Sequence, residues 1–174
     1  MKYIKEYRLF ENVLFTNKKD IEKWLLSNNI KNYIINSDST IDITIGLNLR
    51  NLGLSHIPVQ FNCIYGSFLC DNNKFESFMG FPKKITKDIT CINNNFKSFE
   101  GFPEVNGHVN IGRNPVSEIY NLFKKKNCIQ WINEYKVIRN NSIVLENFKE
   151  VVYMMDIKNF DYDQLYELKN YKII

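Results

Sequence analysis

The stretch CDNNKFESFMGFP, residues 70–82, recurs almost unchanged as CINNNFKSFEGFP, residues 91–103. Nine of the thirteen positions carry the same residue at a spacing of 21. Self-similarity at a fixed short period is typical of solenoid proteins, in which each repeat forms one coil that stacks on the next. The sequence therefore predicts a stacked array of coils about this motif.

The same spacing extends the pattern to residues 47–58 upstream and 109–119 downstream. The apolar or cysteine positions that recur at intervals of 21, 21 and 20 residues are Leu47, Phe68, Ile89 and Val109; Leu49, Cys70, Cys91 and Ile111; Leu54, Phe75, Phe96 and Val116; and Ile57, Phe78, Phe99 and Ile119. Each unit begins with alternating apolar residues, which is typical of a short strand with one buried face. Four units are visible, and we expect their strands to form one parallel sheet in which Cys70 lies over Cys91.

Asparagine and glycine occupy fixed places in each unit. Asn73, Asn94 and Asn114 recur in register, and Leu52 takes this place in the first unit. A side-chain amide both donates and accepts hydrogen bonds, so this row should satisfy the backbone where the chain turns inward. Gly80 and Gly101 precede Phe-Pro and should supply unusual backbone dihedral angles.

The ends of the array should be closed by other elements. Residues 17–29 predict a helix with Asn17 as its N-cap, and two strands around a turn at 37–39 predict a hairpin that continues the repeat sheet. From residue 117 onward several helical patterns follow. We expect an α+β fold with an N-terminal helix and hairpin cap at 1–45, four leucine-rich repeats at 46–116 and a mostly helical C-terminal cap at 117–174.

Composition and charge narrow the functional classes. The chain is 44% hydrophobic with a net charge of +4, has no long apolar run, and begins with scattered charges rather than a signal peptide, so we expect a cytoplasmic protein without a membrane segment. The four cysteines should be reduced, and no C-x-x-C pair or catalytic motif is present. We expect no catalytic residue, cofactor or metal. Nucleic-acid binding through the lysines, which a salt titration would test, is the third and least favoured functional class.

The repeats resemble a known family. The stretch from Cys70 to Pro103 is similar to the degenerate leucine-rich repeat proteins of tailed phages and other AT-rich viral genomes, in which units of the kind C-S-N-N-x-L-x-S-L-x-G-x-P occur in tandem. NIKNYIINSDSTIDI, residues 29–43, resembles their leading hairpin, and NPVSEIYNLF, residues 114–123, resembles the exit from their last repeat. The resemblance implies a phage source and a location in the host cytoplasm. It implies no activity, and phenylalanine in place of leucine implies a bulkier core.

The outward positions of the strands are the candidate binding residues, because side chains alternate across a strand. These positions include Arg50, Leu69, Asp71, Thr90, Ile92, Asn110 and Arg113. Two aliphatic residues with arginine at the edge resemble a protein-binding surface, although scattered aliphatic residues are also ordinary surface. The expected function is non-enzymatic binding of a host or phage protein through the concave sheet. The alternative is a structural subunit of a viral or other large assembly, with contacts from Tyr153, Met154, Met155, Phe160 and Tyr162. The oligomeric state is left open.

Overall fold

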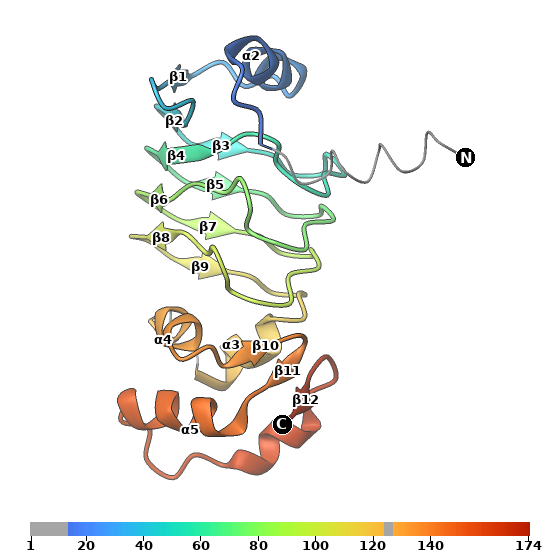
Figure 1. Cartoon of the computed structure of the whole chain (residues 1–174), viewed down its shortest axis with the longest axis vertical. Coiled ribbons are helices and arrows are strands. Elements are labelled where there is room, and N and C mark those ends of the chain that lie inside the picture. Colours follow the sequence, from blue (N-terminus) through green and yellow to red (C-terminus); the bar gives the residue numbers. More distant parts are fainter. Residues whose placement is uncertain (1–13, 124–126) are drawn as a thin grey trace, which may run out of the picture.

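The computed structural model describes residues 14–123 and 127–174. The first residues, which carry the argument against a signal peptide and part of the expected N-terminal cap, lie outside this part. The fold is α+β, with parallel-strand sheets wound into a β-solenoid (Figure 1). Helix α2 (Lys18–Ser27) lies at one end of the stack (Figure 1). Helices α3 (Ser117–Phe123), α4 (Cys128–Glu134) and α5 (Leu145–Met154) lie at the other end (Figure 1). No helix in the described residues is both long and apolar enough to cross a membrane.

One four-stranded parallel sheet contains the strands that the repeat pattern predicts. Its order is β3 (Leu47–Asn48), β5 (Phe68–Leu69), β7 (Ile89–Thr90) and β9 (Val109–Asn110). The first residue of each strand pairs with the first residue of the next, from Leu47 through to Val109. The predicted parallel stacking is therefore confirmed, and the Sγ atoms of Cys70 and Cys91 lie 2.8 Å apart.

A second sheet corrects the expectation of one strand per unit. Its order is β1 (Tyr33–Ile35), β2 (Ile41–Ile43), β4 (Phe61–Ile64), β6 (Lys84–Ile85) and β8 (Glu104–Val105), with β1–β2 antiparallel and the other pairs parallel. The β1–β2 hairpin was expected to extend the sheet of Leu47 and Phe68, and that is wrong. It extends this second sheet, because β2 pairs with β4.

The inner asparagines satisfy the backbone between neighbouring coils. Asn94 Oδ1 accepts a hydrogen bond from the Phe75 N–H at 3.2 Å, and its Nδ2 donates to the carbonyl oxygens of Cys70 and Cys91 at 3.0 and 3.2 Å. Asn73 and Asn114 make the equivalent bonds one coil to either side. The row predicted from the sequence is confirmed. Because each amide bridges two coils, it fixes their register as well as closing a turn.

Phenylalanine fills the interior of the coils. Phe78 and Phe96 stack with ring centroids 4.1 Å apart and an interplanar angle of 4°, and the edge of Phe81 packs against both rings. All three side chains are buried. The bulkier core implied by the sequence is therefore present, and aromatic stacking adds to the burial of apolar area.

The C-terminal module, residues 117–174, combines helices with a small sheet. Its elements are α3 (Ser117–Phe123), α4 (Cys128–Glu134), β10 (Ile138–Arg139), β11 (Ser142–Ile143), α5 (Leu145–Met154), a 3-10 helix (Tyr162–Glu167) and β12 (Lys172–Ile173). The helices were expected, whereas the sheet β10–β11–β12 was not. Each of its strands has two residues, which is too short for a periodic pattern to be recognised.

Candidate functional site

The outer side of the sheet β3–β5–β7–β9, called the β3–β9 face below, carries the candidate binding residues. Three rows of residues run across the coils. The rows are Asn48, Leu69, Thr90 and Asn110; Arg50, Asp71, Ile92 and Gly112; and Asn51, Asn72, Asn93 and Arg113. Each row takes one position from every coil, because the strands pair in register.

Three of the candidate residues form one hydrogen-bonded network. Arg50 Nε donates to Asp71 Oδ2 at 2.6 Å, and the Thr90 hydroxyl donates to the same oxygen at 3.0 Å. Arg50 Nη2 also donates to Thr90 Oγ1 at 3.1 Å, and Asp71 Oδ1 accepts from the Ile92 N–H at 2.8 Å. Asp71 is only 7% exposed. The network links three coils and holds the charges of Arg50 and Asp71 in fixed positions, so this part of the face needs little ordering before it binds.

The third row forms a second ladder of amides, and this one is exposed. Asn72 Nδ2 donates to Asn51 Oδ1 at 2.9 Å, and Asn93 Nδ2 donates to Asn72 Oδ1 at 3.0 Å. These three asparagines and Arg113 have φ between 57° and 60°, in the left-handed region that asparagine tolerates better than most residues. The ladder borders the β3–β9 face with regularly spaced polar groups.

Leu69 and Ile92 are half-buried on the face. Leu69 also lines a hollow of about 480 Å³ where the two sheets meet, together with Ile45, Tyr65 and Lys87. Ile45 is 53% exposed and Tyr65 is 56% exposed. The hollow therefore extends the apolar part of the face, and we call it the Tyr65 hollow.

Sequence reasoning missed the residues of the Tyr65 hollow because it missed the second sheet. A signal was present. Ile43, Ile64, Ile85 and Val105 recur at intervals of 21, 21 and 20 residues, the same intervals as the other rows. A second inward row just before the first indicates a second strand, and the corner between them is where Tyr65 lies.

Asn110 and Arg113 lie apart from the central network. Both are exposed in the last coil, and the only hydrogen bond of either side chain within the described residues runs from the Gly112 N–H to Asn110 Oδ1 at 3.3 Å. The structure thus brings together Arg50, Asp71 and Thr90 with Leu69 and Ile92 beside them. It leaves the other two candidates at the edge nearest the C-terminal module.

The cysteines have the character of core residues. Cys70 and Cys91 are fully buried, and burial raises the pKa of Cys70 well above its ordinary value. Burial likewise raises the pKa of Cys128 to about 12. Thiols held neutral are weak nucleophiles and poor metal ligands. Within the described residues, no cluster of three or more histidine, cysteine, aspartate or glutamate side chains is placed to hold a metal ion.

Comparison of the chain with models of protein families, with curated proteins and with solved structures found no match. What the chain does must therefore be inferred from its own residues and contacts.

Proposed function

We propose that this chain is a non-enzymatic binding module of the phage leucine-rich repeat type, which docks a host or phage protein through the β3–β9 face. In this proposal α2 and the β1–β2 hairpin close one end of the repeats and the C-terminal module closes the other. Coils of about 21 residues with an inner asparagine row support the repeat assignment. The phage source rests on the resemblance of the repeat units alone.

One observation supports the choice of surface more than any other. Leu69 and Ile92 lie half-buried beside the ion pair of Arg50 and Asp71. Both charged groups of that pair are also hydrogen-bonded to Thr90. An apolar centre with a polar border is how the core and rim of a protein interface are arranged. A charged network formed in advance reduces the entropy lost on binding. The exposed Tyr65 beside this centre adds the kind of aromatic anchor that dominates interface energies.

The test compares baits that differ at one position. Leu69→Asp places a charge at the centre of the face, and Ile92→Gln replaces the second aliphatic residue without placing a carboxylate beside Asp71. Tagged wild type and both variants are used for affinity purification, followed by mass spectrometry. We expect a protein that wild type recovers to be lost with both variants, while the thermal midpoint stays within a few degrees of wild type. Recovery of the same protein in equal amount by all three baits contradicts the proposal.

A structural subunit of a larger assembly is the second candidate, and one surface favours it. Tyr153 at the end of α5 is 80% exposed and the adjacent Met154 is 42% exposed. Phe160 and Tyr162, which were expected to contribute to the same contact, instead pack with Phe148 in the module's own core. The contact surface of this candidate is therefore reduced to the end of α5.

Tyr153→Asp tests this second candidate and serves as the control for Leu69→Asp. It is sharper than deleting residues 140–174, because that deletion removes the buried Phe148 and Leu165 from the core. A complex lost with Tyr153→Asp and retained with Leu69→Asp supports the structural role. The reverse pattern supports the binding module.

A further inference from the structure

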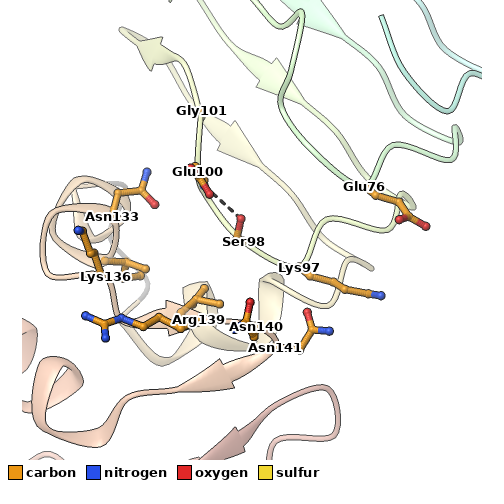
Figure 2. Close-up of a pocket in the computed structure, with 12 residues that line it drawn as sticks. Glu76, Lys97, Ser98, Glu100, Gly101, Asn133, Lys136, Arg139, Asn140 and Asn141 are labelled. Carbon is orange, nitrogen blue, oxygen red and sulfur yellow. Dashed lines mark hydrogen bonds between the residues drawn. The ribbon is translucent and has the colours of Figure 1, made fainter. Parts of the chain in front are cut away.

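A polar groove of about 790 Å³ lies between the third coil, which begins at Ile89, and the C-terminal module (Figure 2). One wall is the return segment 97–101 with Glu76, and the other is the end of α4 with the β10–β11 hairpin. Two hydrogen bonds join the coil to the module beside the groove: Asn133 Nδ2 donates to the Phe99 carbonyl at 2.7 Å, and the Tyr171 hydroxyl donates to the Lys97 carbonyl at 2.7 Å. This cavity, called the module groove, therefore lies between two anchored walls and does not depend on a free loop.

The module groove is lined by cations that form no ion pair with the described part of the chain. Lys97, Lys136 and Arg139 line it, and within the described residues none of the three lies within salt-bridge distance of a carboxylate. Glu76, on the coil wall, already accepts a hydrogen bond from Asn95 Nδ2 at 2.9 Å. Elsewhere in the described residues, exposed Lys84 and Lys149 each pair with a glutamate, at 2.8 and 2.9 Å. Glu76 and Glu100 lie on the coil wall, and the module wall, with Lys136 and Arg139, offers positive charge to a ligand.

The hairpin tip adds neutral hydrogen-bonding groups. Asn140 and Asn141 form the two-residue turn between β10 and β11, with φ of 47° and 59°, as such turns require. Figure 2 shows both side chains at the rim of the groove, opposite Ser98. Neither side-chain amide makes a hydrogen bond within the described residues. An amide both donates and accepts, which suits it to a polypeptide backbone.

The positive charge continues around the hairpin tip. A smaller hollow of about 400 Å³ shares Asn140 and Asn141 with the module groove and adds Lys169 and Lys172. The nearby Glu118 does not compensate these lysines through an ion pair. Its carboxylate instead accepts from the Lys169 and Asn170 N–H groups and from Asn170 Nδ2, at 3.1, 3.2 and 2.7 Å.

We propose that the module groove binds an acidic segment of a protein partner, with carboxylates against Lys136 and Arg139 and the segment's backbone hydrogen-bonded to Asn140 and Asn141. This surface is separate from the β3–β9 face, so the two proposals stand or fall separately. A peptide fits better than a nucleic acid for two reasons. Glu76 and Glu100 on the coil wall oppose a continuous chain of phosphates, and the lining contains no aromatic side chain on which a base could stack.

The experiment measures binding of a fluorescein-labelled decapeptide of alternating glutamate and glycine by fluorescence anisotropy at low salt. The test variant combines Lys136→Glu with Arg139→Glu. The matched control combines Lys19→Glu with Lys23→Glu on α2, which makes the same change of net charge at the other end of the molecule. We expect roughly tenfold weaker binding for the test variant and less than about twofold for the control, because each pair of exposed charges contributes modestly.

Amide chemical shifts give a second readout, which distinguishes binding in the groove from nonspecific attraction of the peptide to the charged protein. We expect the peptide to shift the resonances of Gly101, Asn140 and Asn141 and to leave those of α2 unchanged. If the double variant is unfolded by its thermal midpoint, Arg139→Gln replaces it, with an expected loss of roughly threefold. Four outcomes overturn the proposal: no binding by wild type, equal loss in test variant and control, equal binding of the matching lysine and glycine peptide, or tighter groove-dependent binding of a single-stranded oligonucleotide.

Discussion

The repeats and the C-terminal module achieve burial in opposite ways. In the repeats one contact is made several times: Phe68 over Leu47, Ile89 over Phe68 and Val109 over Ile89 are the same contact in successive coils. In the module each contact is made once. Phe148 packs against three different rings, those of Phe123, Phe160 and Tyr162, at centroid distances of 5.1, 5.3 and 6.4 Å. A contact that recurs leaves a period in the sequence, and a contact made once leaves none.

The two regions nevertheless share one core. The buried apolar side chains form a single cluster that runs from α2 through the coils into the module. At the junction Phe99 faces Tyr120, with ring centroids 6.4 Å apart. Because apolar contacts continue across this junction, we expect the two regions to unfold together, whatever their difference in regularity.

The largest expected effect tests this shared core directly. Phe96→Ala removes a fully buried ring from the coils, and Phe148→Ala removes one from the module. Each should lower the free energy of unfolding by about 3–5 kcal/mol in a urea titration, because truncating a buried phenylalanine leaves a cavity. Both variants should show a single transition at a lower urea concentration. Two separate transitions, with only the earlier one moved by Phe148→Ala, would show that the regions fold independently.

A smaller effect separates two glycines that the sequence makes equivalent. Gly80 and Gly101 both precede Phe-Pro and have φ of +79° and +78°. A methyl group at Gly80 would overlap the carbonyl oxygen of Ile57, whereas at Gly101 its nearest neighbour is Phe78 Cβ at 3.5 Å. Gly101→Ala should therefore cost about 1 kcal/mol from the backbone conformation alone. Gly80→Ala should cost about 3 kcal/mol, because overpacking against backbone adds to that strain.

Thermal or urea unfolding of the two glycine variants, measured side by side, gives the difference between their losses of stability. Equal losses of stability would mean that the surroundings of Gly80 and Gly101 are packed alike. That result would contradict the close approach at Gly80.

The smallest of the expected differences is the one between two pH values, and it reports on the module. Burial raises the pKa of Cys128 from 9.0 to about 12, so the folded chain keeps this proton at a pH where the unfolded chain loses it. The unfolded state then binds fewer protons, and stability falls as pH rises from about 9 toward 12. At about pH 10 this thiol should reduce the free energy of unfolding by about 1.4 kcal/mol relative to about pH 8.

Cys128→Ala should remove that part of the pH dependence and leave the part caused by Cys70, whose pKa burial also raises. Urea titrations at the two pH values measure it. An unchanged pH dependence in Cys128→Ala would show that this thiol is not buried in the folded chain.

The arrangement of the β3–β9 face could be predicted from the sequence only in part. Alternation along a strand was enough to place Leu69, Ile92 and Arg50 on one side of a sheet. Alternation was not enough to show that Asp71 is buried and bonded to Arg50 and Thr90. Those partners lie 21 and 19 residues away, and the contacts depend on the register of the coils. Tyr65 was missed for the same reason, since its exposure follows from a corner between two sheets.

The module groove is even less predictable from the sequence than the β3–β9 face. Lys97 belongs to a coil, while Lys136 and Arg139 belong to the module, and nothing in the spacing of these residues indicates that they line one cavity. They come together because Asn133 and Tyr171 attach the module to the return segment of the third coil.

The sequence by itself determined the period of the coils, the in-register parallel strands, the inner asparagine row and the stacking of Cys70 on Cys91. Each of these is a local relation repeated in every coil, so the evidence for it accumulates along the chain. Only the tertiary structure decided the second sheet, the burial of Asp71, the Tyr65 hollow and the module groove. Those features depend on where elements with unlike sequences meet, and such contacts occur once, between side chains that no period relates.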